Sequence, residues 1–231
     1  MECTGERAIE GQSSTRTMAD HLERYRFAQQ FVEGKDVLDI ACGSGYGTAL
    51  LAEGGARSVV GMDLSSAAIA HAEKNHASRQ ISFRQGDLQT LHLPTTFDVI
   101  VSFETIEHVQ EYMQALHALF EALRPHGTLI FSTPNRRITS PHLRSIHGKP
   151  NNPFHVREFL PEEMSTFLQQ VGFLPEHIHL YGQRQQKRIL PTRLLRFIYK
   201  CLVNPAVHAS PKVLPVESLH PRYMVIVANK E

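Results

Sequence analysis

The stretch Asp36-Val-Leu-Asp-Ile-Ala-Cys-Gly-Ser-Gly-Tyr-Gly47 decides the fold class of this chain. Its first five residues are mostly apolar and a cluster of glycines follows them, which predicts a short buried strand that turns into a helix. Glycines at such a turn let the backbone approach a ligand, and the first turn of the helix presents unpaired amide groups. The dinucleotide-binding pattern requires a third glycine where this chain has Thr48. The stretch therefore predicts a ligand-binding loop that departs from that pattern.

Strand and helix patterns alternate on both sides of this stretch. Strands are predicted at residues 36–40, 58–62, 81–83, 97–102, 128–132, 177–181 and 223–228. Helices are predicted at residues 20–32, 48–53, 65–76, 113–123 and 161–171, with Ser65 as an N-cap, Pro125 as a stop and Pro161 in a first turn. Strands that alternate with helices indicate a parallel sheet with helices on both faces. The predicted fold class is therefore α/β, with a doubly wound, mostly parallel seven-stranded sheet. An N-terminal lid helix and a helical insertion between the last two strands complete it.

The length of the chain, 231 residues, suits one domain with additions. Residues 1–19 are polar and show no periodicity, so they are predicted to be a mobile arm, and residues 20–231 form the single domain. Two long connections, residues 133–160 and 183–221, follow strands of the predicted sheet. Long loops in a compact domain are usually functional, so both are predicted to form the substrate side of a site.

The composition excludes several classes of protein. The chain has 24 Lys and Arg against 23 Asp and Glu, and a net charge of +1 excludes a polyanion binder that relies on bulk charge. Cys3, Cys42 and Cys201 are far apart, which excludes a disulfide scaffold and a thiolate zinc site. The sequence shows no signal-peptide pattern and no apolar run of about 20 residues. We therefore expect a cytoplasmic protein without a transmembrane segment.

Three aspartates stand at the ends of successive predicted strands. Asp39 precedes the glycines, Asp63 ends the next strand, and Asp87 follows the third. A carboxylate about 20 residues beyond the glycines is placed to bind ribose hydroxyls. A carboxylate after the third strand can accept a hydrogen bond from an exocyclic amine. Three carboxylates in this arrangement favour a cationic nucleoside over a pyrophosphate.

Together these segments resemble the class I S-adenosylmethionine-dependent methyltransferases. The segments that carry the resemblance are residues 37–47, 60–64, 86–88, 97–108 and 123–135, and it extends over about residues 20–183. It implies S-adenosylmethionine as the cofactor, with Asp39 at the methionine part, Asp63 at the ribose and Asp87 at the adenine. The cofactor site that it implies consists of Tyr25, Asp39, Ala41, Cys42, Gly43, Gly45, Asp63, Leu64, Asp87, Leu88, Ser102 and Phe103. A domain of the same fold with another ligand is the alternative.

The run Ser102-Phe-Glu-Thr-Ile-Glu-His108 places two carboxylates and an imidazole at the end of a central strand. If a helical turn begins here, Glu104, Glu107 and His108 share one face of it. Oxygen ligands with one imidazole suit Mg²⁺ or Mn²⁺, whereas a capped turn with a packing histidine is the alternative without a metal. The run is similar to one in the small-RNA 2′-O-methyltransferases and in the O-methyltransferases of ubiquinone biosynthesis.

A second histidine completes this resemblance. His155 in Asn152-Pro-Phe-His-Val-Arg-Glu-Phe159 matches the histidine that completes the magnesium site of the RNA enzymes. The resemblance therefore implies four metal ligands, Glu104, Glu107, His108 and His155, of which the last three are the predicted catalytic residues. A cation there would lower the pKa of a substrate hydroxyl. Without a metal, His108 or His155 would act as the general base.

Residues 4–7 and 21–28 bear on the acceptor. They resemble bacterial methyltransferases that occur with glycosyltransferases in surface-polysaccharide pathways. This resemblance implies a sugar or other polyol hydroxyl as the acceptor, and a helix over the cofactor with Tyr25 against it. The predicted function is thus an S-adenosylmethionine-dependent O-methyltransferase. Methylation of an RNA end, methylation of a natural-product phenol or nitrogen, and a non-catalytic binding module stay open.

The charge pattern bears on partners. The near-zero net charge and an aromatic content of 8% without Trp argue against an RNA substrate. Between His177 and Val216, however, the chain has Arg and Lys but no Asp or Glu. This segment could bind a nucleotide-linked sugar, a lipid-linked glycan or a polynucleotide, and residues 184–203 could contact a membrane surface. A solvated cover helix is the alternative. We expect a glycan acceptor rather than nucleic acid.

Overall fold

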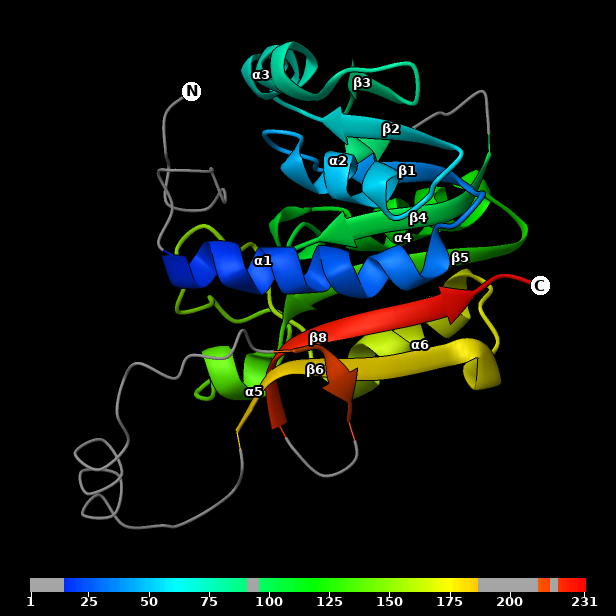
Figure 1. Cartoon of the computed structure of the whole chain (residues 1–231). Coiled ribbons are helices and arrows are strands. Elements are labelled where there is room, and N and C mark those ends of the chain that lie inside the picture. The colour runs from blue at the N-terminus through cyan, green and yellow to red at the C-terminus, as the bar shows by residue number, and fades with distance from the viewer. Residues whose placement is uncertain (1–14, 91–95, 187–211, 217–219) are drawn as a thin grey trace, which may run out of the picture.

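An eight-stranded sheet organises the part of the chain that the structure describes. The computed structural model describes residues 15–90, 96–186, 212–216 and 220–231. The strands are β1 (Asp36–Ile40), β2 (Ser58–Asp63), β3 (Ile81–Gln85), β4 (Phe97–Phe103), β5 (Leu123–Pro134), β6 (Ile178–Gln186), β7 (Leu214–Pro215) and β8 (His220–Asn229). Their order is β3-β2-β1-β4-β5-β8-β6-β7 (Figure 1). Strands β1 to β5 pair in parallel, and β8 is antiparallel to both β5 and β6.

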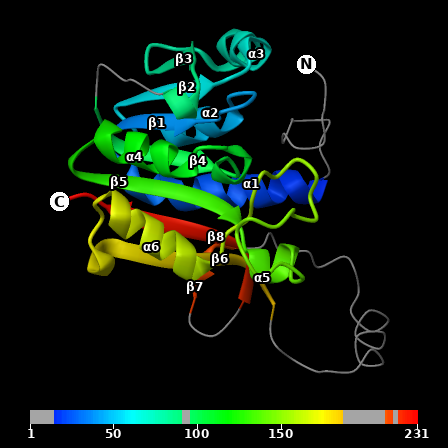
Figure 2. The same ribbon diagram turned by 180° about the vertical axis from the view of Figure 1, so that it is seen from behind.

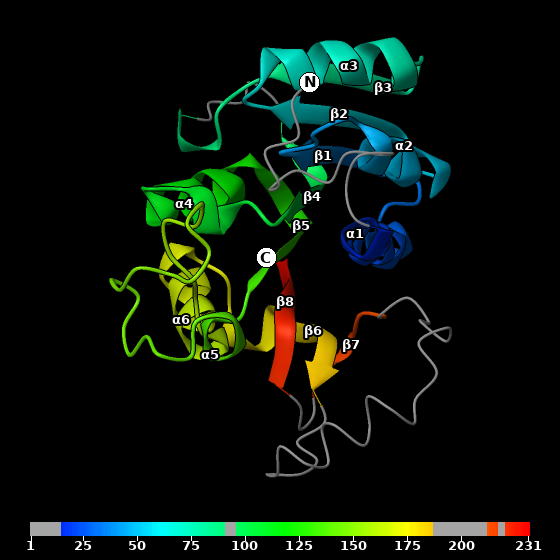
Figure 3. The ribbon, with the colours of Figure 1, turned by 90° about the vertical axis from the view of Figure 1, so that its left-hand side faces the viewer.

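Helices cover both faces of this sheet. They are α1 (Thr15–Ala28), α2 (Tyr46–Glu53), α3 (Ser66–His76), α4 (Tyr112–Ala122), α5 (Arg136–Thr139) and α6 (Pro161–Val171). Short 3₁₀ turns lie at η1 (Gln29–Phe31), η2 (Leu88–Thr90), η3 (Ile106–His108) and η4 (Pro175–His177). Helices α1 and α2 lie on one face, and α4 and α6 lie on the other (Figures 1, 2 and 3).

The hydrophobic core is split by the sheet in the same way. Val37 packs in the cluster under α1 and α2, whereas its neighbour Leu38 packs in the cluster under α4 and α6. Successive side chains of a strand point to opposite faces, so a strand that is covered on both sides is apolar throughout. The doubly wound, mostly parallel α/β fold is therefore confirmed.

Several predicted boundaries were wrong. The sheet has eight strands instead of seven, because the two-residue β7 pairs with β6 at the edge. The first helix begins at Thr15 and ends at Ala28, so residues 15–19 of the expected arm are helical. The remainder of that arm, residues 1–14, and residues 187–211 of the predicted helical insertion lie outside the described residues.

The two predicted connections are also shorter than expected. Strand β5 runs to Pro134 and α5 follows it, so regular structure occupies the start of residues 133–160. Strands β6 and β8 take the ends of residues 183–221. Backbone hydrogen bonds to neighbouring strands extend β5, β6 and β8 beyond the apolar residues from which the strands were predicted. The Ser65 cap is confirmed, since its side chain accepts a hydrogen bond from the amide of Ala68.

The strand order places a candidate ligand site at the carboxyl ends of the central strands. The chain moves outward from β1 through β2 to β3, and then returns to place β4 on the other side of β1. Ligands bind at such a reversal, in the crevice outside the carboxyl ends of the strands. The segments that follow β1, β2 and β4 meet there.

Candidate functional site

A cavity of about 470 Å³ opens at the carboxyl ends of β1, β2 and β4. We call it the first cavity. Its lining residues are His21, Tyr25, Ala41, Cys42, Gly43, Tyr46, Asp63, Leu64, Phe103, Glu104, Thr105, His108 and Phe154. A smaller cavity of about 150 Å³ shares Asp63 and Leu64 with it and adds Asp87 and Leu88. The structure thus brings together most of the predicted cofactor site.

Asp63 organises the loop after β1. Its Oδ2 accepts a hydrogen bond from the amide of Gly43 at 3.0 Å, and its Oδ1 accepts one from the amide of Ser65 at 2.8 Å. Gly43 has a φ of 56° with open space beside it, so glycine is favoured there by the left-handed backbone rather than by crowding. One carboxylate therefore fixes both the glycine loop and the start of α3.

Asp39 lies beneath the first cavity and does not line it. It is fully buried, and it accepts hydrogen bonds from Thr48 Oγ1 at 2.7 Å and Tyr25 Oη at 3.1 Å. Burial raises the pKa of Asp39 to about 7, although the hydrogen bonds from Thr48 and Tyr25 oppose this shift. Asp39 therefore acts as an anchor for Tyr25.

Two other predicted cofactor residues also lie behind the cavity wall. Gly45 has a φ of 87°, and a Cβ there would lie 2.8 Å from Ala72 and 2.9 Å from a ring atom of Phe83. Ser102 is buried in β4. Neither residue lines the first cavity or the smaller cavity beside it. Both positions therefore support the wall of the site.

Helix α1 closes the first cavity through Tyr25. The Tyr25 ring packs edge-on against Phe103 at a centroid distance of 5.0 Å and against Tyr46 at 5.7 Å. A Cβ at position 47 would lie 2.0 Å from this ring, so Gly47 is required for α1 to dock. The predicted placement of Tyr25 against the cofactor site is consistent with this geometry.

A second cavity of about 340 Å³ adjoins the first. Its lining residues are Thr17, Asp20, His21, Arg24, Glu104, Glu107, His108, Pro134, Thr139, Asn151, Asn152, His155, Glu158, Arg222 and Tyr223. His21, Glu104 and His108 line both cavities. The two cavities are therefore separated by these three side chains.

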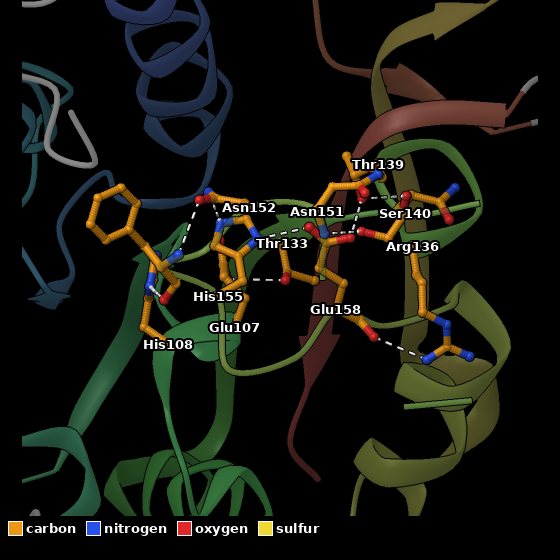
Figure 4. A network of polar contacts seen from close by, with 12 residues as sticks. Glu107, His108, Thr133, Arg136, Thr139, Ser140, Asn151, Asn152, His155 and Glu158 are labelled. Carbon is orange, nitrogen blue, oxygen red and sulfur yellow. Dashed lines mark hydrogen bonds and ion pairs between the residues drawn. The ribbon is translucent and has the colours of Figure 1, made fainter. Parts of the chain in front are cut away.

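Glu107, His108 and His155 form a compact group in the wall of the second cavity (Figure 4). Each offers one potential ligand atom, and these atoms lie within 4.8 Å of one another. Glu107 is fully buried, and its Oε2 accepts a hydrogen bond from Thr133 Oγ1 at 3.0 Å. Its Oε1 has no hydrogen-bond partner among the described residues. Burial, with Glu104 nearby, raises the pKa of Glu107 well above its ordinary value.

Glu104, the fourth predicted ligand, lies outside this group. The turn η3 begins only at Ile106, and Glu104 precedes it with a φ of 50°. The expected common helical face therefore does not form. Glu104 Oε1 accepts a hydrogen bond from Ser132 Oγ at 2.7 Å and lies 3.7 Å from Arg24 Nη1. The guanidinium of Arg24 is itself almost fully buried in the wall of the second cavity.

His155 is held from two sides. Its Nδ1 lies 2.8 Å from Glu158 Oε1, and its Nε2 lies 2.7 Å from Nδ2 of the Asn152 side chain (Figure 4). Burial alone would raise the pKa of Glu158, but hydrogen bonds from His155, Thr139 and Ser140 lower it below its ordinary value. Glu158 therefore holds its charge beside the imidazole.

The sequence reasoning missed Arg24 and Glu158. Arg24 directly precedes the predicted contact residue Tyr25, and Glu158 stands three residues after His155. The His-x-x-Glu spacing was the available signal for Glu158. Arg24 donates a hydrogen bond to Gln183 Oε1 at 2.9 Å, across 159 positions of sequence, and no local pattern indicates that contact.

The second cavity has many ionisable side chains in its wall. Its wall holds four carboxylates, Asp20, Glu104, Glu107 and Glu158, against the guanidinium groups of Arg24 and Arg222. Burial, together with Arg24, lowers the pKa of His21 well below its ordinary value, so this imidazole is neutral at neutral pH. The cavity is therefore polar and rich in hydrogen-bond acceptors.

Comparison with known proteins gives the class. The sequence matches the methyltransferase domain family over residues 12–202. A protein of Mycolicibacterium smegmatis, named a probable S-adenosylmethionine-dependent methyltransferase, is 37% identical over 172 residues, which are 74% of this chain and 64% of that protein. The mitochondrial ubiquinone biosynthesis O-methyltransferase of Schizosaccharomyces pombe is 35% identical over 169 residues, which are 71% of this chain and 58% of that protein. This chain belongs to the methyltransferase domain family, and its class is that of the S-adenosylmethionine-dependent methyltransferases.

Solved structures agree on the fold. An S-adenosylmethionine-dependent methyltransferase from Mesorhizobium loti aligns with a TM-score of 0.61 at 21% identity, over 89% of this chain and 95% of that one. The chain spans about half to two thirds of the length of the curated relatives that it matches first. Within the described residues, no helix combines the length and apolarity that a membrane span requires. Residues 187–211 of the basic segment lie outside the described residues, so its contacts stay a prediction.

Proposed function

We propose that this chain transfers a methyl group from S-adenosylmethionine in the first cavity to a hydroxyl of a sugar or other polyol in the second cavity. We further propose that a divalent cation, Mg²⁺ or Mn²⁺, assists. The observation that carries the proposal is the wall shared by the two cavities, because a methyl group passing between them would pass His21, Glu104 and His108.

The lining of the second cavity supports a polyol acceptor. Among its described lining residues, Pro134 is the single purely aliphatic side chain, and carboxylates outnumber guanidinium groups. Carboxylate, amide and imidazole groups can each pair with a hydroxyl group, whereas an apolar acceptor would leave them without partners. Relatives named for O-methylation in ubiquinone biosynthesis also support oxygen as the methylated atom.

The group of Glu107, His108 and His155 offers one carboxylate and two imidazoles to a divalent cation. The carboxylate oxygen suits Mg²⁺ and Mn²⁺, whereas imidazole nitrogen suits a transition metal better than Mg²⁺, so this group favours Mn²⁺ of the two. Glu107 Oε1 is buried without a partner among the described residues, which is costly unless a ligand pairs with it. A cation held there would polarise an acceptor hydroxyl and lower its pKa.

The residues of the chain then have separate roles. Asp63 shapes the glycine loop and would bind the ribose of the donor, while Tyr25 closes the first cavity from α1. Glu107, His108 and His155 would orient the acceptor hydroxyl beside the shared wall. Holding the two reactants in line supplies much of the rate, because the methyl group of a sulfonium is already activated.

An acceptor screen tests the proposal. The purified chain is incubated with methyl-radiolabelled donor and free sugars, nucleotide-linked sugars, phenols, amines or RNA ends. We expect label on a polyol oxygen, a loss of at least tenfold in rate with EDTA, and recovery with Mg²⁺ or Mn²⁺. Label that appears only on RNA or nitrogen contradicts the acceptor assignment. A rate on polyols that is unchanged by chelation contradicts the metal and supports a histidine general base.

A further inference from the structure

The side chain of Glu158 is built into the wall behind His155. It is only 1% exposed. Its Oε1 faces His155 Nδ1, and its Oε2 accepts a hydrogen bond from Thr139 Oγ1. Thr139 belongs to α5, which directly follows β5. The carboxylate is thus held from behind by one element while it faces the candidate site.

The backbone around Glu158 is also fixed. Its carbonyl oxygen accepts a hydrogen bond from Arg136 Nη1 at 3.0 Å (Figure 4). The guanidinium of Arg136 also pairs with Glu163 at the start of α6. The side-chain Nδ2 of Asn151 donates to the carbonyl oxygen of Thr139 at 2.7 Å, and the backbone amide of Asn151 donates to Ser140 Oγ at 2.9 Å. These contacts join the loop of His155 to α5 and α6, so Glu158 has little freedom to move.

Hydrogen bonding on both sides of His155 selects one tautomer. Nδ1 lies 2.8 Å from Glu158 Oε1, and a carboxylate oxygen in this position accepts the hydrogen bond that a ring N–H donates. On the other side, Asn152 Oδ1 accepts from the amide of Phe154 at 3.2 Å, which directs the NH₂ group of Asn152 toward Nε2. An NH₂ group only donates, so Nε2 must accept. Both neighbours require the same form of the ring.

We infer that Glu158 is a positioning residue that holds His155 as the Nδ1–H tautomer and directs its Nε2 lone pair toward Asn152 and the second cavity. In this form Nε2 carries the lone pair that a cation or a proton would need, and in this structure that lone pair accepts the hydrogen bond from Asn152. Carboxylates that orient a ligating histidine in this way are worth tenfold to hundredfold in affinity or activity. The effect on turnover rests on the proposed function of His155, whereas the tautomer does not.

The tautomer can be read directly. Long-range ¹H–¹⁵N spectra of the full chain labelled with ¹⁵N-histidine separate protonated from unprotonated ring nitrogens, and the loss of one signal set in His155→Gln assigns the residue. We expect a protonated Nδ1 in the wild type and a shift toward protonated Nε2 in Glu158→Met, which keeps side-chain length but accepts no N–H. The same variant should lose about tenfold to hundredfold in kcat. Its donor affinity should stay within about twofold, because Glu158 does not line the first cavity.

A matched control separates positioning from general support. Glu163→Gln weakens the Arg136 pair in the same network but does not touch His155, so it should lower thermal stability and leave the His155 tautomer unchanged. If Glu158→Met does not fold, Glu158→Asp withdraws the carboxylate from Nδ1 and gives the same test. A protonated Nε2 in the wild type, or an unchanged tautomer in the Glu158 variants, overturns the inference. Full turnover in His155→Gln overturns instead the proposed function of this residue.

Discussion

The two cavities are built in different ways. The first cavity is lined chiefly by short segments that directly follow β1, β2 and β4, three adjacent parallel strands. The second cavity is lined by α1, η3, α5, the loop of residues 151–158 and the start of β8, which are far apart in sequence. A site at strand ends follows from the fold itself, whereas a site between distant segments depends on how those segments pack. The position of the first cavity therefore follows from the fold, whereas that of the second depends on how these distant segments pack in this chain.

Helix α1 connects the two cavities through neighbouring residues. Tyr25 points into the first cavity and reaches Asp39, while Arg24 lines the second cavity and reaches Gln183 on β6. Substitutions that touch only one cavity should therefore alter only donor binding or only turnover. The following variants test that division, beginning with the largest effect.

Glu107→Gln should have the largest effect, on turnover alone. The variant keeps the shape of a fully buried side chain that lines the second cavity and not the first. It removes the carboxyl group that would bind a cation or exchange a proton with the substrate, so kcat should fall about a thousandfold. Isothermal titration with S-adenosylhomocysteine should give a donor Kd within about twofold of the wild type. A large change in Kd would mean that the two cavities are not separate.

Asp63→Ala should act on the other cavity. It removes the acceptor of two backbone hydrogen bonds, from Gly43 and Ser65, and the proposed ribose ligand. Hydrogen bonds to charged groups are worth about 1.5–3 kcal/mol each, so the donor Kd should rise several hundredfold by the same titration. Asp87→Ala, which leaves the glycine loop intact, serves as the milder control. Normal donor affinity in Asp63→Ala would contradict the placement of the donor.

The same division explains what the sequence could predict. The glycines and Asp63 stand at fixed offsets from a strand, so their spacing alone indicates the first cavity. Glu107 and His155 required a second matched segment, and the structure brings them together with His108. Arg24 was not predicted, and Glu104 was predicted on a helical face that does not form, because the contact of Arg24 with Gln183 and the left-handed backbone at Glu104 arise only from packing. The two-residue β7 carries no periodic pattern of its own.

Asp39→Asn should change the pH dependence of stability. Because the folded-state pKa of Asp39 is about 7 and its ordinary value is 3.8, the unfolded state releases this proton first as pH rises. The free energy of unfolding is then lost progressively between these two values. Asparagine does not titrate, so between pH 5 and pH 7 the free energy of unfolding of the variant, measured in urea, should rise relative to that of the wild type by about 2 kcal/mol. If the free energies of unfolding of wild type and variant change in parallel with pH, the folded-state pKa of Asp39 is not raised.

Tyr25→Phe should have the smallest effect, and it tests whether α1 docks through its ring or its hydroxyl. The variant keeps the edge-on contacts with Phe103 and Tyr46 and the close packing on Gly47, but it loses the hydrogen bond to Asp39. A net loss of about 1 kcal/mol in the free energy of unfolding is expected for one such bond. The donor Kd should rise no more than about threefold, since the ring still closes the first cavity. Tyr112→Phe, on the opposite face of the sheet against Phe159 and Phe167, is the matched control for removing a hydroxyl. A donor affinity that falls as far in Tyr25→Phe as in Asp63→Ala would mean that the hydroxyl, through Asp39, holds α1 closed over the first cavity.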